Sequence, residues 1–375
     1  MDFNLTSLVR TLATRNDLAL QVQYLMIKAP PGRAEHPRQH RDISSEDLDL
    51  FNNMFEMNFK PTNGDSISIS QDSSQQPWEK GQVRPQDEGH CEQDKGLFYQ
   101  HPKSALAALL LAQVPNILRF SMDSESLLPF SICQPGSLPR LAEFHVSLPS
   151  NEDSLADIQN VLAAAPALER LNARLGYMTS NKVFHGNLTT LSLHSCDFTA
   201  DAFKSLLNGS KRLECLSYEN PQRSKIQQAT LPELLDAILL RADTLRSLIL
   251  WFNTRDGHQS IDVSMVENLK DMRTLEKLDI TLDGVYHPAH LRLDNILPRS
   301  IRTFSNIYPA FCSPYQEKTR AVIALAKSVP GKFPNLKQVL FCLCEDEASD
   351  EKEVKHNRSK IRAAFAKRGI VCLLE

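Results

Sequence analysis

One leucine-spaced phrase, apolar-x-x-apolar-x-apolar, recurs along this chain and constrains its fold more than any other feature. The clearest copy is LTTLSL at 188–193, followed by a helix-like stretch and then by the start of the same phrase. The copies lie at 22–27, 117–122, 141–146, 168–173, 188–193, 213–218, 245–250, 275–280, 301–306 and 336–341. In a strand, the last two apolar residues of each copy point to one side. We therefore expect ten strands that each bury one face.

The spacing of the copies is irregular. From Phe120 onward, the middle residues of successive copies are 24, 27, 20, 25, 32, 30, 26 and 35 residues apart. Segments with helical spacing lie between them, such as the one carrying Phe203, Leu206 and Leu207. One strand and one helix joined by variable loops explain this spacing, whereas arrays of paired helices keep a fixed length. The sequence predicts an α/β, irregular leucine-rich-repeat solenoid with a curved parallel sheet inside and helices outside.

Composition divides the chain into three parts. Residues 1–28 are expected to form an N-terminal cap helix and the first repeat strand. Residues 29–101 are rich in Pro, Ser, Gln and charge, which predicts a largely mobile insertion, with a docked helix at 45–59 where Phe51 and Phe55 have helical spacing. Residues 102–375 are expected to form the leucine-rich-repeat-like solenoid with a C-terminal cap. Within them, 344–360 is interpreted as a charged loop and 370–374 as a closing strand.

Charge and hydropathy restrict the partners and the location of the protein. The chain carries 42 basic and 45 acidic residues, so no global field favours nucleic acid or an anionic membrane. Charged residues interrupt the apolar N-terminus, and the apolar run at 105–112 is far shorter than the roughly 20 residues of a membrane span. We expect an intracellular monomer, cytoplasmic or nuclear, with no nucleic-acid or membrane partner.

The usual catalytic and cofactor motifs do not occur in the sequence. GxGxxG, GxxxxGK[ST], HExxH, GxSxG and an EF-hand loop are all missing, which predicts no enzyme, no catalytic residues and no cofactor. Cys342 and Cys344 alternate in VLFCLCE and are expected to face the core rather than bind a metal, since a structural zinc needs four ligands. Cys196, at the ninth position of its phrase, is expected to be buried in the turn after the strand.

Three segments carry a resemblance to a known family. LTSLVRTLATRNDLALQVQYLMI at 5–27, ALAALLLAQVPNILRFSM at 105–122 and KFPNLKQVLFCL at 332–343 resemble the fungal F-box/leucine-rich-repeat-like proteins. The resemblance implies a substrate receptor of an F-box-type ubiquitin ligase, with a Skp-type adaptor and a cullin as further partners. The F-box itself is expected to be absent from this chain, because no LPxEIxxxI-like helical segment precedes residue 5.

The outward positions of the strands are the candidate functional surface. In a solenoid of this kind they line the concave side, which offers a broad site for another protein. Trp251 follows the inward Leu250 and is expected to anchor a partner, or else to pack on Phe252 or a nearby loop. The candidate partner-binding residues are Trp251, His194, Ser192, Glu219, Asp279, Thr281, Arg174 and His145. The function predicted is non-catalytic protein recognition; the alternatives are a free-standing scaffold without a ubiquitin link and, more distantly, an enzyme whose site is not visible in sequence.

Overall fold

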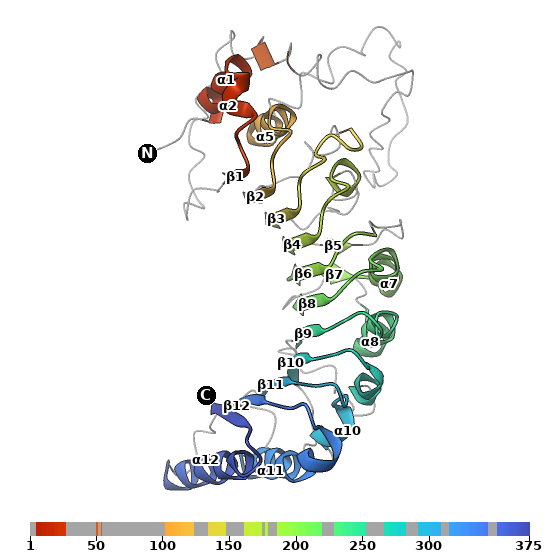
Figure 1. Cartoon of the computed structure of the whole chain (residues 1–375), viewed down its shortest axis with the longest axis vertical. Helices are drawn as coiled ribbons and strands as arrows, with labels where there is room; N and C mark the ends of the chain where they lie inside the picture. Colours follow the sequence, from red (N-terminus) through yellow and green to blue (C-terminus); the bar gives the residue numbers. More distant parts are fainter. Residues whose placement is uncertain are drawn as a thin grey trace, which may run out of the picture.

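The computed structural model describes most of the chain outside the region that follows the first strand. The described residues are 5–27, 50–51, 54, 102–123, 134–147, 161–174, 177–178, 186–219, 229–252, 266–282, 292–308, 315–343 and 351–375. They form an α/β arrangement with an eleven-stranded parallel sheet, consistent with a solenoid-like fold. Figure 1 shows the strands on the inner side of an arc and the helices on its outer side.

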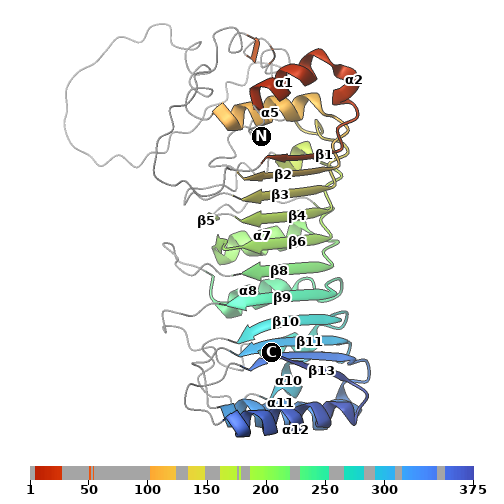
Figure 2. The ribbon, with the colours of Figure 1, turned by 90° about the vertical axis from the view of Figure 1, so that its left-hand side faces the viewer.

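The large sheet follows the order of the sequence, apart from two short strands that pair with each other, β5 (Tyr177–Met178) and β7 (Asp197–Phe198). Figure 2 shows its strands stacked from one end of the molecule to the other. All ten leucine-spaced phrases lie on it in order. Its strands are β1 (Tyr24–Ile27), β2 (Arg119–Asp123), β3 (Glu143–Ser147), β4 (Arg170–Arg174), β6 (Thr190–His194), β8 (Cys215–Glu219), β9 (Ser247–Phe252), β10 (Lys277–Leu282), β11 (Thr303–Tyr308), β12 (Gln338–Leu343) and β13 (Val371–Leu374).

Burial alternates along the strands, as a sheet with one covered face requires. In β6, Leu191 and Leu193 are buried, whereas Thr190, Ser192 and His194 are partly exposed. The first leucine of each phrase, such as Leu188, is buried in the turn that precedes its strand. From the second copy onward, the phrase therefore places three side chains of each unit in one continuous core, all of them apolar except Asn306, and those of the first copy pack against it partly buried.

Asn306 on β11 breaks this apolar rule. It occupies a core-facing position between Ile280 of β10 and Phe341 of β12, and its side chain is fully buried. Neither Oδ1 nor Nδ2 has a hydrogen-bond partner among the described residues. A buried amide without partners is costly, so this position lowers the stability of the array.

Helices cover the outer side of the sheet. In α7, Ala202, Phe203, Leu206 and Leu207 are buried at helical spacing, and the hydroxyl of Thr199 accepts a hydrogen bond from the backbone N–H of Ala202. The helical spacing predicted for Phe203, Leu206 and Leu207 is therefore confirmed. The described helices of the array are α5 (Pro102–Gln113), α7 (Ala200–Gly209), α8 (Leu231–Leu239), α10 (Leu293–Ile296), α11 (Tyr315–Lys332) and α12 (Glu351–Ala366), with a 3-10 helix η2 at Glu267–Asp271.

A repeated hydrogen-bond pattern joins each unit to the next at the start of the strands. The backbone N–H groups of Arg302 and Thr303 both donate to the carbonyl of Glu276, at 2.7 and 2.9 Å. The same two-to-one arrangement recurs from the β1–β2 junction to the β11–β12 junction. It fixes the register of neighbouring strands at one edge of the sheet, whatever the length of the segment between them.

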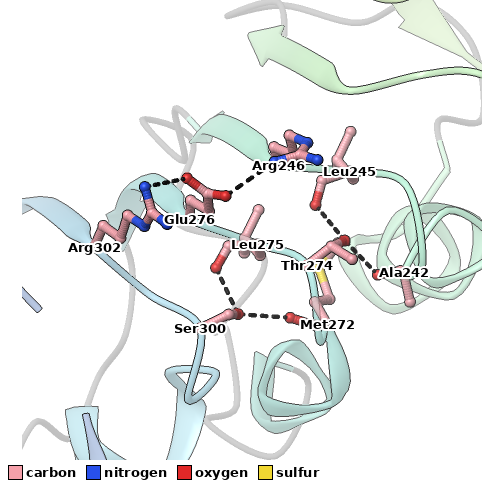
Figure 3. Close-up of polar contacts among 9 residues, drawn as sticks. All are labelled: Ala242, Leu245, Arg246, Met272, Thr274, Leu275, Glu276, Ser300 and Arg302. Carbon is pink, nitrogen blue, oxygen red and sulfur yellow. Dashed lines mark hydrogen bonds and ion pairs between the residues drawn. The ribbon is translucent and has the colours of Figure 1, made fainter. Parts of the chain in front are cut away.

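Hydroxyl groups strengthen this edge between β9, β10 and β11, as Figure 3 shows. The Thr274 hydroxyl lies 2.9 Å from the carbonyl oxygens of Ala242 and Leu245, and Ser300 makes the equivalent contacts to Met272 and Leu275. Thr274 and Ser300 each directly precede the first apolar residue of a leucine-spaced phrase. Beside them, the partly exposed Glu276 forms ion pairs of 3.1 and 3.3 Å with the exposed arginines at positions 246 and 302, which contribute little because solvent screens them.

The N-terminal end of the array is closed by helices. Helix α1 (Leu5–Thr14) packs on α5 and is followed by α2 (Asn16–Ala19) and β1. Of the segment 29–101, only Leu50, Phe51 and Met54 are described; all three are helical, and Phe51 and Met54 are buried in the common core. The rest of the predicted insertion, including most of the helix expected at 45–59, lies outside the described residues.

The C-terminal end differs from the prediction in one respect. The interpretation of 344–360 as a loop is wrong for residues 351–360, because α12 begins at Glu351. Val354, Asn357, Ile361 and Phe365 bury one face at helical spacing, and the acidic first turn favours the helix N-terminus. The closing strand expected at 370–374 is present as β13.

Candidate functional site

The concave face of the sheet carries three rows of outward side chains that run across the strands. We name them the first, second and third inner rows. The first row begins each strand with Arg119, Glu143, Arg170, Thr190, Cys215, Ser247, Lys277, Thr303 and Gln338. The second row contains Ser121, His145, Asn172, Ser192, Ser217, Ile249, Asp279, Ser305 and Leu340, and the third contains Asp123, Ser147, Arg174, His194, Glu219, Trp251 and Thr281. Apart from the buried Ser305, these residues are at least partly exposed, because the core-facing residues alternate with them.

A hollow of about 460 Å³ lies over β2, β3, β4, β6 and β8. It is mainly polar and is built from the second and third inner rows, together with Val146 and the residue that follows β6. Its lining residues are Ser121, Asp123, His145, Val146, Ser147, Asn172, Arg174, His194, Ser195 and Glu219. Four of the predicted site residues therefore line one hollow, and Ser192 lies in the second row beside Asn172.

Two histidine–glutamate pairs hold side chains at this face. The imidazole Nε2 of His145 lies 2.7 Å from Oε1 of Glu143, and Nδ1 of His194 lies 3.2 Å from Oε2 of Glu219. Glu143 also pairs with Arg119 at 2.9 Å. The hydrogen bond to His145 lowers the pKa of the Glu143 carboxyl; burial opposes this change and the charge of Arg119 reinforces it. Both carboxylates are thus held by side chains of the sheet, and Glu143 has the cationic Arg119 beside it.

Arg174 is the cationic group of the hollow. It lies in the third row between Ser147 and His194, is exposed, and has no hydrogen-bond or ion-pair partner in the described part of the chain. On the same strand, Asn172 occupies the second row. Its amide, the guanidinium and the neighbouring hydroxyls provide many hydrogen-bond donors within a small area.

Trp251 lies in the third row on β9, directly beside Glu219 of β8. Its side chain is 39% exposed, and its indole Nε1 donates to Oδ1 of Asp279 at 3.4 Å. Thr281 is its partner in register on β10. The outward position predicted for Trp251 is correct, and the three residues expected in this part of the site, Trp251, Asp279 and Thr281, lie on two adjacent strands.

Toward the C-terminus, the concave face becomes more apolar. Leu340 of β12 is partly exposed, and Val371 and Leu373 on β13 are exposed. Cys342 is half-buried on the face opposite to the buried Phe341, so its predicted core-facing position is wrong; Cys344 lies outside the described residues. The reason is register: Val339 and Phe341 supply the inward positions of β12.

A second hollow of about 500 Å³ lies among η2, α10 and the end of α11. Its central group is Asp294, whose side chain is 3% exposed and pairs with Lys332 at 2.6 Å and Arg292 at 3.0 Å. Burial raises the pKa of Asp294, whereas the hydrogen bonds from Lys332 and Arg292 together lower it by more, so the pKa lies below its usual value. These contacts tie α10 to α11 and use the carboxylate for structure.

Sequence reasoning missed several residues of the concave face. Asp123, Ser147 and Ser195 line the first hollow, and Glu143 orients His145, yet none was among the predicted site residues. Asp123 and Ser147 stand four residues after the start of their strands, the same position as Arg174 and His194. Extending the register used for the middle units to β2 and β3 would have identified them.

Searches for metal sites, membrane spans and relatives give no further lead to function. No group of three or more His, Cys, Asp and Glu that could hold a metal ion occurs among the residues that the structure describes. In the same residues, no helix has the length and apolar character needed to cross a membrane. No protein-family model matches this chain, and a comparison with curated proteins also finds no match.

Proposed function

We propose that this chain is a leucine-rich-repeat solenoid that recognises another protein on the concave face of its sheet, without catalysis. The observation that carries this proposal is the arrangement of the three inner rows. Most of their side chains lie outside the core, and they include the hollow around Arg174 and the exposed Trp251. A broad surface with a polar region and a central aromatic residue suits a macromolecular partner.

The substrate-receptor role remains part of this proposal and rests on the resemblance to F-box/leucine-rich-repeat-like proteins. In that role the concave face holds a ubiquitylation substrate inside the cell, in the cytoplasm or the nucleus. A Skp-type adaptor and a cullin would then belong to the same complex. A scaffold without a ubiquitin link would use the same face, so the two versions differ in their other partners.

The test is a comparison of concave-face variants with a variant of the outer side. Trp251→Ala removes the proposed anchor, and Ser192→Arg places a long cation in the middle of the concave face. Lys360→Ala changes an exposed residue of α12 and is the matched control. We expect each concave variant to lower the affinity for a protein that co-purifies stoichiometrically by roughly tenfold or more, and the control to have no effect.

Circular dichroism and thermal unfolding of each variant establish that the fold is retained. If all three variants bind the partner equally, the concave face is not the recognition surface. Mass spectrometry of the same complex separates the two versions: a Skp-type adaptor with a cullin supports the receptor role, and their absence beside another stoichiometric protein favours the scaffold.

A further inference from the structure

We propose that the hollow around Arg174 binds one anionic group, a carboxylate or a phosphate, on the protein that the concave face recognises. This inference rests on the proposed function and specifies the chemistry of the partner. It starts from three adjacent strands, β3, β4 and β6, whose second and third rows form a compact group. The members of this group, which we name the anion seat, are His145, Ser147, Asn172, Arg174, Ser192 and His194.

The anion seat contains hydrogen-bond donors and no carboxylate. Arg174 is at its centre in the third row, with Ser147 on one side and His194 on the other. A guanidinium presents five N–H donors in a planar fork that fits the two oxygens of a carboxylate or a phosphate. The charge of Arg174 is available, because no described residue pairs with it.

Both histidines are already held by carboxylates outside the seat. Nδ1 of His194 faces Glu219, and Nε2 of His145 faces Glu143. In each ring the nitrogen beside the carboxylate carries a proton, since a carboxylate only accepts hydrogen bonds. The pairing therefore restrains the two imidazoles at the border of the seat and gives the carboxylates of Glu219 and Glu143 hydrogen-bond donors.

The acidic residues at the two ends limit what can bind. Asp123 and Glu219 are both in the third row, each two strands away from Arg174, which corresponds to about 10 Å at the usual strand spacing. This is a distance between strands, and the Glu219 side chain reaches back to His194; within the row, a single anion over Arg174 has Ser147 and His194 as its direct neighbours and no carboxylate. A polyanion that ran along the row would meet both carboxylates. The charge pattern thus favours one anionic side chain of a protein over a nucleic-acid backbone.

The experiment uses the full chain and three blocked tripeptides, acetyl-Gly-X-Gly-amide, in which X is phosphoserine, aspartate or serine. Each peptide is titrated at constant ionic strength while the Nε–Hε signals of the arginine side chains are followed by NMR. The Arg174 signal is identified by its loss in Arg174→Gln. Arg170→Gln is the matched control, because Arg170 is on the same strand but does not line the hollow.

We expect a saturable shift of the Arg174 signal with phosphoserine, with aspartate or with both, and none with serine. In Arg174→Gln, the binding measured on the neighbouring amides should weaken by about tenfold, and in Arg170→Gln by less than twofold. Binding of the phosphoserine peptide alone identifies a phosphate as the anion; binding of both peptides identifies any carboxylate or phosphate.

No saturable shift with either anionic peptide, or equal weakening in the two variants, would overturn the proposal. Because the titration needs no partner protein, its result is separate from the test of the proposed function. If neither anionic peptide binds but Trp251→Ala still weakens binding of the partner protein, the anion seat is ruled out and recognition on the concave face is retained.

Discussion

Replacing Asn306 by valine should make the protein more stable. The side chain of Asn306 is fully buried in the core beneath β11, and neither polar atom has a partner among the described residues. Relief of such an unsatisfied amide is worth about 1 to 3 kcal/mol. Valine has one heavy atom fewer than asparagine, but its methyl groups are bulkier and branched at Cβ, so an imperfect fit in the core offsets part of the gain. We expect a net increase of about 1 to 2 kcal/mol in the free energy of unfolding.

Urea unfolding measures this change, and amide hydrogen exchange in β10, β11 and β12 locates it. Asn335→Val is the control, because Asn335 is exposed just before β12 and its replacement should change stability by less than about 0.5 kcal/mol. The reasoning is refuted if Asn306→Val lowers the free energy of unfolding by 1 kcal/mol or more. Such a loss would mean that the amide is satisfied in the folded protein.

Substitutions at three further sites, with Thr244 as a control, test the structure. Thr274→Val should cost about 1 kcal/mol in urea unfolding because two carbonyls lose their shared hydroxyl. The same change at Thr244 should cost less, because its hydroxyl has one contact to the described residues, at 3.5 Å. Asp294→Asn should lower the free energy of unfolding by about 2 kcal/mol near neutral pH, because the ion pairs of the carboxylate are lost. Since the pKa of Asp294 is lowered in the folded protein, the difference from wild type should shrink as the pH falls below about 4. A difference that does not depend on pH would contradict this explanation. Ser195 has a φ of 52°, a backbone conformation that glycine adopts easily and a β-branched residue does not. Ser195→Gly should therefore raise the midpoint of thermal unfolding and Ser195→Val should lower it. A lower midpoint for Ser195→Gly than for Ser195→Val would rule out backbone strain at this residue.

The strands were predictable because their information is local. The spacing of Leu188, Leu191 and Leu193 recurs along the chain. Alternation along an extended strand then assigns the inward and outward faces without knowledge of neighbouring units. The burial of Cys196 followed from the same phrase; its thiol contacts the carbonyls of Ala173 and His194 at 3.5 and 3.4 Å. The first part of α12, residues 351–360, was missed because the charged residues there obscured the helical spacing of Val354 and Asn357.

The hollow was not predictable in full, because it depends on which residues of different units become neighbours. The pairing of His194 with Glu219 joins residues 25 positions apart, and only the parallel register brings them together. The same register sets Arg174 beside Ser147 and His194. Single-strand patterns identify outward residues, but the contact between His194 and Glu219 comes from the packed sheet, in whose described part Arg174 has no partner.

The strands of the sheet lie across the long axis of the molecule, so the hydrogen bonds between them run along that axis, and the two ends of the chain lie at opposite ends of the array. A pulling force applied to the termini therefore acts in line with these hydrogen bonds and opens them one after another, as in a zipper. Units of 20 to 35 residues would be released as separate events, each lengthening the chain by roughly 70 to 120 Å. The molecule should yield under load in small steps from its ends, and the middle of the concave face should be the last part to open.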